Sequence, residues 1–121
     1  MNIENLRDYC LCKKAVTEEL PFGPDTLVFK VMGKVFALTG LDKVPLSVNV
    51  KCDPEKAVKL REAYEDNILP GYHMNKKHWN TVILDGRLAP KLILTMIDDS
   101  YDLVVRGLTK KQQKEIKDFD E

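Results

Sequence analysis

A short run from His73 to Asn80 gathers side chains that could carry out chemistry. It contains both histidines and the only tryptophan of the chain. Imidazole can bind a metal or transfer a proton, lysine can contact phosphate, an amide can hydrogen-bond a base edge, and indole can stack. The candidate site residues are His73, Asn75, Lys76, Lys77, His78, Trp79 and Asn80.

A metal site or a catalytic centre is poorly supported by these residue types. Zinc needs four ligands, and two histidines with two asparagines do not supply them. Cys10 and Cys12 could add a ligand, but a C-x-C spacing alone is a weak signal. Only Thr81 and Asp85 lie near the histidines as reaction partners, and no nucleophile motif is present. We therefore expect no metal, no cofactor and no enzymatic activity.

A nucleic-acid contact makes better use of the same residues. Lys76, Lys77 and a partly protonated His78 could meet phosphates, while Asn75 and Asn80 could hydrogen-bond base edges. The structural alternative is a solvated turn whose histidines form local hydrogen bonds. The chain has 19 basic and 19 acidic residues, so DNA binding would be weak and salt-dependent.

The expected geometry of this run is a β-hairpin that turns at Lys76 and Lys77. Alternation would then place one set of side chains on an exposed polar face and the other set on an apolar face that packs on the core. Two lysines are poor residues for a two-residue turn, and a longer loop would change the register. The polar set is His73, Asn75, His78 and Asn80, and the apolar set is Tyr72, Met74, Trp79 and Thr81.

The rest of the chain predicts a sheet with helices. Asn2 can cap a helix that ends near residue 13, and Asp53 followed by Pro54 begins another. Thr109 and Gln112 form a capping box before the last helix. Strands are predicted over 26–32, 34–39 and 46–52, and a long helix over 90–106 with Gly107 as its cap.

Predicted packing positions follow from this pattern. The helix after Pro54 should turn Ala57, Leu60, Ala63 and Tyr64 inward, and Phe22, Phe29 and Phe36 should be packing residues. Strands joined by short turns favour an antiparallel sheet. We expect an α+β fold, an antiparallel sheet with helices packed on one side, as a single domain over residues 1–121.

Composition indicates an ordinary globular protein. Hydrophobic residues make up 44% of the chain and charged residues 31%. No apolar run is long enough for a membrane span, and the N-terminal residues do not resemble a signal peptide. Three cysteines, an odd number, favour a reducing compartment, so the expected location is the cytoplasm.

Four segments resemble the MmcQ/YjbR-like family of small bacterial domains. These are residues 22–38, 46–62, 70–86 and 96–105, and the run HMNKKHW is the most specific part. The resemblance implies a compact CyaY-like (frataxin-like) fold with a "double wing" arrangement. It also implies a DNA-binding or regulatory accessory role, and no catalytic residues.

The frataxin-like relationship implies an alternative function. Frataxins use an acidic ridge on the first helix and first strand to bind iron, and here only Glu4, Asp8, Glu18 and Glu19 lie in that region. The alternative is a non-enzymatic module that binds a protein, a small ligand or a metal. The oligomeric state and the protein partner are not predicted by the sequence.

Overall fold

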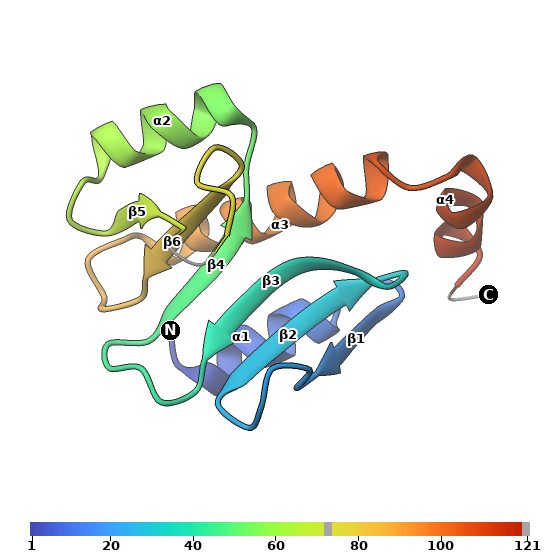
Figure 1. The fold of residues 1–121 in the computed structure, drawn as a ribbon, viewed down its shortest axis with the longest axis horizontal. Coiled ribbons are helices and arrows are strands. Elements are labelled where there is room, and N and C mark those ends of the chain that lie inside the picture. Colours follow the sequence, from blue (N-terminus) through green and yellow to red (C-terminus); the bar gives the residue numbers. More distant parts are fainter. Residues whose placement is uncertain (72–73, 120–121) are drawn as a thin grey trace.

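The computed structural model describes residues 1–71 and 74–119 and contains one sheet with its helices (Figure 1). The sheet has the strand order β1-β2-β3-β4-β6-β5, and every neighbouring pair is antiparallel. The strands are β1 (Val16–Glu19), β2 (Thr26–Val31), β3 (Lys34–Gly40), β4 (Ser47–Lys51), β5 (Ile68–Pro70) and β6 (Trp79–Ile83). The helices are α1 (Ile3–Leu11), α2 (Pro54–Ala63), α3 (Pro90–Arg106) and α4 (Lys110–Lys117).

Helices α1, α2 and α3 cover one face of the sheet, as the sequence predicted, and α4 lies to one side of the sheet (Figure 1). Ion pairs tie them together on that side, because Asp98 of α3 accepts from Lys13 just after α1, and Asp99 of α3 pairs with Lys56 of α2. Tyr9 of α1 also donates to Asp98, at 2.7 Å. The core lies between the sheet and these helices and includes Leu6, Phe29, Val31, Phe36, Val48, Val50, Val82, Ile93, Met96 and Ile97.

The helix boundaries follow the predicted caps. The Asn2 side chain accepts from the Asn5 backbone at 2.8 Å, and Thr109 forms its capping box with Gln112. Asp53 accepts from the Lys56 backbone at the start of α2. Each of these side chains satisfies a backbone N–H that has no partner within its helix. The long helix spans Pro90–Arg106, with Gly107 as its C-cap, as expected.

The first strand, β1, was not predicted. Its sequence is Val-Thr-Glu-Glu, and only Val16 has the residue type and apolar character that indicate a strand. The strand forms because β2 offers it a free edge, with Val16 opposite Val31. Lys30 pairs with Glu19 across that edge at 2.6 Å, which adds a polar contact between the two strands.

Two predicted packing sites are wrong. Phe22 is 74% exposed, because it lies in the turn between β1 and β2 rather than on a strand. Ala63 and Tyr64 are also exposed, and of the predicted inner stripe only Ala57 is buried and Leu60 half-buried. The buried part of the stripe is therefore confined to Ala57 and Leu60.

The pairing between β3 and β4 is short and divides the sheet into two halves. Only Ala37 opposite Val50 and Leu38 opposite Asn49 are paired. Figure 1 shows the two strands diverging toward the side where α3 ends. At that point the Ser100 hydroxyl of α3 enters the ladder, donating to Phe36 O at 2.5 Å and accepting from Lys51 N at 2.8 Å.

Candidate nucleic-acid interface

The loop between β5 and β6 is longer than the predicted hairpin turn. Pro70 lies opposite Asn80, and Gly71 N donates to Trp79 O at 2.9 Å, so the connection leaves the ladder at this point. Asn75 O then accepts from the backbone N–H groups of both His78 and Trp79. The predicted two-residue turn at Lys76 and Lys77 is wrong.

The physical reason lies in the turn chemistry. A two-residue hairpin turn needs positive φ at both central residues, and lysine does not favour that conformation. Asn75 instead opens the turn, because its side-chain oxygen accepts from Lys77 N at 2.9 Å. This local bond is the usual way in which asparagine stabilises a turn.

The two faces of β6 are the reverse of the prediction. Asn80 is 1% exposed and lies on the helix-covered face, where its Nδ2 donates to Ala57 O of α2 at 3.4 Å. Its Oδ1 has no hydrogen-bond partner in the described part of the chain. Asn80 therefore cannot contact a nucleic acid in this conformation, and its place on an exposed polar face was wrongly predicted. The remaining polar residue His73, with Tyr72 of the apolar set, lies outside the described residues.

Trp79 lies on the open face of the sheet and is half-buried there. It is not part of the core cluster, so its predicted packing on the core is wrong. Its cross-strand partner is Lys51 of β4. On the same face, the Thr81 hydroxyl donates to Asn49 Oδ1 of β4. The open face of β4 and β6 therefore presents an indole, a lysine and a pair of hydrogen-bonding side chains.

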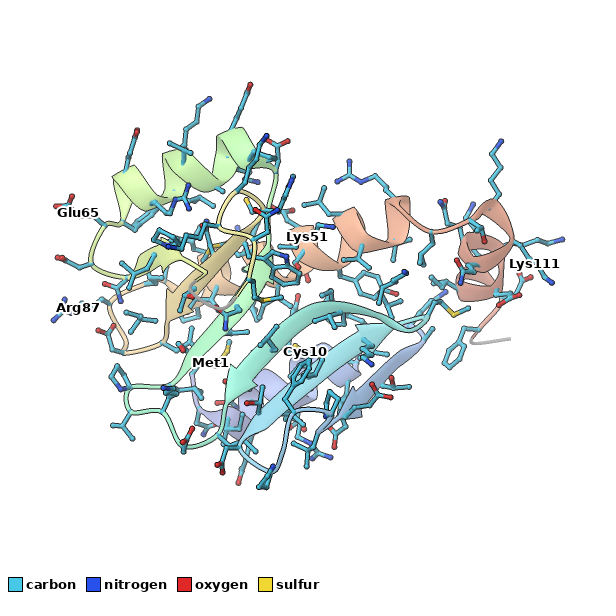
Figure 2. The ribbon with its side chains drawn as sticks, in the orientation of Figure 1. Met1, Cys10, Lys51, Glu65, Arg87 and Lys111 are labelled. Atoms are coloured by element: carbon cyan, nitrogen blue, oxygen red, sulfur yellow. The ribbon has the colours of Figure 1, made fainter. Side chains whose placement is uncertain are left out.

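The tip of the loop places its basic residues in solvent. Asn75, Lys76 and Lys77 are all exposed, whereas His78 is half-buried. Arg61 of α2 donates to Lys76 O at 3.0 Å, which fastens the loop tip to the helix. Figure 2 shows the side chains of this part of the molecule around α2 and the end of β4, where Lys51 is labelled.

A shallow groove along α2 extends this surface. Its volume is about 530 Å³, and residues of α2 and the loop line it together, among them Val58, Arg61 and Lys77. The groove also contains Glu55 and Glu62, so its charge is mixed. The loop and α2 thus form one continuous surface, with Lys77 on the side that faces the groove.

Comparison with known proteins identifies the chain. The YjbR family model matches residues 11–103. The chain belongs to the YjbR family. It is 45% identical over 98 residues to the uncharacterized protein YbdF of Escherichia coli O157:H7, covering 80% of this chain and 79% of YbdF. It is 32% identical over 114 residues to the uncharacterized protein YjbR of Escherichia coli K12, covering 94% and 96% of the two chains.

A solved structure agrees with the fold of this YjbR-family chain. The crystal structure of Deinococcus radiodurans protein DR2400 superposes with a TM-score of 0.89 at 42% identity, covering 95% of this chain and 87% of that one. A Pseudomonas syringae protein superposes with a TM-score of 0.71 at 32% identity, covering 85% and 98%. The predicted family and the α+β class are confirmed.

Two of the four acidic residues in the region of the first helix and first strand of this YjbR domain are paired with basic side chains. Glu18 accepts two hydrogen bonds from Arg7 at 2.7 Å, and Glu19 pairs with Lys30. Among residues 1–71 and 74–119, no group of three or more histidine, cysteine or carboxylate side chains is placed to hold a metal ion. Glu18 and Glu19, two of the four carboxylates of this region, are therefore paired with neighbouring cations.

The three cysteines of the YjbR domain are free thiols with different surroundings. Cys10 is buried, and the loss of solvent raises its pKa to about 12. Burial also raises the pKa of the Cys52 thiol, which follows β4 directly and is buried. Cys12 alone is exposed. No helix of the described chain is long and apolar enough to cross a membrane.

Sequence reasoning missed Lys51 and Asn49 as neighbours of the candidate interface, whereas it placed Thr81 on the same face as Trp79. A usable signal was present, since alternation in the sequence LSVNVK places Asn49 and Lys51 on the face opposite Val48 and Val50. What the sequence lacked was the pairing of β4 with β6. That pairing brings Lys51 opposite Trp79.

Proposed function

We propose that this YjbR-family protein binds nucleic acid weakly, through the open face of β4 and β6 and the loop that precedes β6. Trp79 supplies a stacking surface, while Lys51, Lys76 and Lys77 contact phosphates. The observation that carries the proposal is the position of Trp79, half-buried on the uncovered face and directly opposite a lysine. A protein of this kind acts as a cytoplasmic regulatory or accessory factor and not as an enzyme.

The physical chemistry favours extended, unpaired bases over a duplex groove. An aromatic side chain on an open sheet stacks on a base of any sequence, and such stacking contributes about 1–3 kcal/mol per base. The loop is fastened to α2 through Arg61 and does not project as a free two-stranded hairpin. Asn49 and Thr81 lie on the same face and offer hydrogen bonds to a base edge.

The expected affinity is low. The chain carries no net charge, so only a local group of cations attracts the phosphate backbone. Three lysine–phosphate contacts give a logarithmic salt slope of roughly −2 on a single strand, since each neutralised phosphate contributes about −0.7. Binding should therefore be measurable at low salt and much weaker near physiological salt.

The lone tryptophan makes the test direct, because Trp79 is both the proposed contact and the fluorescent reporter. Labelled single-stranded and duplex oligonucleotides are titrated at low and near-physiological salt, with anisotropy and Trp79 emission read in parallel. We expect saturable quenching and a preference for the single strand. Lys76→Ala with Lys77→Ala should weaken binding and flatten its salt dependence.

A matched control distinguishes the loss of the loop lysines from the loss of any two positive charges. Lys110→Ala with Lys111→Ala removes the same charge from α4, distant from Trp79 along the fold. This control should bind as the native protein does. Equal losses in both double variants, or no binding at low salt, would remove the loop and the open face from any nucleic-acid interface.

A further inference from the structure

A second feature of the molecule, separate from the loop before β6, is the cleft between the two halves of the sheet. It has a volume of about 280 Å³, near the lower end of the range for small-molecule sites, about 300–1,000 Å³. It lies where β3 and β4 diverge, at the end of α3. Its lining consists of Lys34, Val35, Lys51, Leu103, Val104, Gly107 and Leu108.

The cleft is held open by a hydrogen bond that replaces strand pairing. In a continuous ladder Phe36 O would accept directly from Lys51 N. Here the Ser100 hydroxyl stands between these two groups and bonds to both. The Phe36 carbonyl and the Lys51 N–H therefore both keep a partner while the strands stay apart.

The cleft is lined by two lysines, Lys34 and Lys51, and by a set of apolar side chains. Val104 and Leu108 are buried, and Val35 and Leu103 are half-buried. Within the described residues, neither Lys34 nor Lys51 forms an ion pair, in contrast to Lys13, Lys30 and Lys56.

The carbonyl oxygens at the C-terminal end of α3 repel a negatively charged ligand only weakly. A helix C-terminus normally presents carbonyl oxygens with partial negative charge. Here Gly107 N donates to the carbonyls of Leu103 and Val104, and Leu108 N donates to that of Val105. The Arg106 carbonyl accepts from Gln113 of α4, at 3.5 Å. These acceptors already have donors, and the two lysines set the charge of the cleft.

We propose that this cleft binds a small organic anion, with an anionic oxygen headgroup held between Lys34 and Lys51 and a short apolar body against Val35, Leu103 and Leu108. The chemistry is shared by carboxylates and phosphate esters. The site shares Lys51 with the proposed nucleic-acid interface, whereas Lys34 and the end of α3 belong to the cleft alone.

The test is an NMR titration of the uniformly labelled full chain with hexyl phosphate, hexanoate, hexanol and inorganic phosphate. The two amphiphilic anions should shift the amide signals of Val35 and residues 103–108 in a saturable way. The relative affinity of hexyl phosphate and hexanoate identifies the preferred headgroup. Hexanol lacks the anionic headgroup and inorganic phosphate lacks the apolar body, so each should bind at least about tenfold more weakly than hexyl phosphate.

Variants connect the binding to the cleft. Lys34→Gln with Lys51→Gln should weaken hexyl phosphate binding about tenfold, since solvent screens the exposed Lys34 and the half-buried Lys51 and keeps the contribution of each charge modest. Val35→Phe should block the apolar base, and its amide spectrum reports whether the fold is kept. Lys43→Gln with Lys110→Gln removes the same charge elsewhere and should leave binding unchanged.

Two results would overturn the site. One is an unchanged affinity in the Lys34 and Lys51 double variant whose spectrum shows a native fold. The other is hexanol binding as tightly as hexyl phosphate, which would make the cleft merely apolar. Oligonucleotide binding in Lys34→Gln reports separately on the open-face proposal, so each proposal can fail without the other.

Discussion

The two faces of the sheet carry different kinds of side chains, although these side chains come from neighbouring residues of the same strands. On the covered face, Val82, Val48 and Val50 pack under the helices, and the polar side chain of Asn80 is buried beside them. On the open face, the intervening positions of β6 carry Trp79 and Thr81. One residue step separates a core position from a position on the open face, because side chains alternate along a strand.

The two faces also differ in the size and polarity of the side chains that β6 places on them. The small polar asparagine is inside, and the largest aromatic residue of the chain is outside. Asn80 leaves one oxygen without a partner, and Trp79 leaves part of its indole in solvent. Neither arrangement maximises stability, which is typical of positions retained for reasons other than packing.

The largest contrast should appear between neighbours on β2. Phe29 is fully buried on the covered face, whereas Lys30 is half-buried on the other face and pairs with Glu19. Phe29→Ala should lower the free energy of unfolding by about 3–5 kcal/mol, through lost burial and the cavity left behind. Lys30→Ala should cost less than about 1 kcal/mol. Urea unfolding of both variants measures the contrast, and similar losses would mean that the open face is covered in solution.

Ser100→Ala should have the next largest effect. The substitution leaves Phe36 O and Lys51 N without their shared partner and should cost about 1–3 kcal/mol. Hydrogen exchange at Lys51 should accelerate more than exchange at Val48. If stability and exchange are unchanged, β3 and β4 close directly on each other without the serine, and the cleft between them does not persist.

Substitutions at Trp79 and Asn80, adjacent residues on opposite faces of β6, test the difference between the two faces more sharply. Trp79→Ala should reduce stability by less than about 2 kcal/mol, because the indole is half-buried outside the core, and should abolish oligonucleotide binding. Asn80→Leu should change stability by less than about 1.5 kcal/mol, since it removes a buried oxygen that has no partner along with one long hydrogen bond. Thermal and urea unfolding, with the anisotropy titration, separate the two roles. A severe loss of stability in Trp79→Ala would place the indole in the core after all.

The smallest effect should be a pH dependence at the edge of the covered face. The hydrogen bond from Tyr9 to the Asp98 carboxylate raises the pKa of Tyr9 from 10.0 to about 12. The folded state therefore keeps a proton that the unfolded chain loses first. The stability from this contact is complete below about pH 10 and disappears as the pH rises toward 12.

Tyr9→Phe provides the matching measurement. At neutral pH it should cost about 0.5–1.5 kcal/mol, the usual contribution of one hydrogen bond. The difference in unfolding free energy between the native protein and the variant should shrink between about pH 10 and 12. A constant difference across that range would show that Tyr9 keeps its ordinary pKa in the folded protein.

Much of the fold could be predicted from local signals. The helix at Pro90–Arg106, the capping residues Asn2, Asp53 and Thr109, and the strands before and after Gly33 all appear where the sequence indicated. These features depend on residues within a few positions of one another. The strand β1 was missed because its pairing with β2, and not its own composition, makes it a strand.

The candidate site was predicted in its location but not in its geometry. Lys76 and Lys77 are exposed at the loop tip, as expected, and the faces of Trp79 and Asn80 are exchanged. The exchange arises because alternation places Trp79 and Asn80 on opposite faces without indicating which face the helices cover. The longer loop that opens at Asn75 is a separate difference, which changes the partners of β6 in β5.

The sequence by itself determined the family, the α+β class, the ends of the helices and the zero net charge that limits any phosphate binding. Each of these follows from residue types or from short-range spacing. Only the tertiary structure decided that Trp79 lies in the open opposite Lys51, and that Ser100 separates β3 from β4. Both depend on contacts between residues that are distant in the chain, and an alternating pattern specifies two faces without saying which of them the helices will cover.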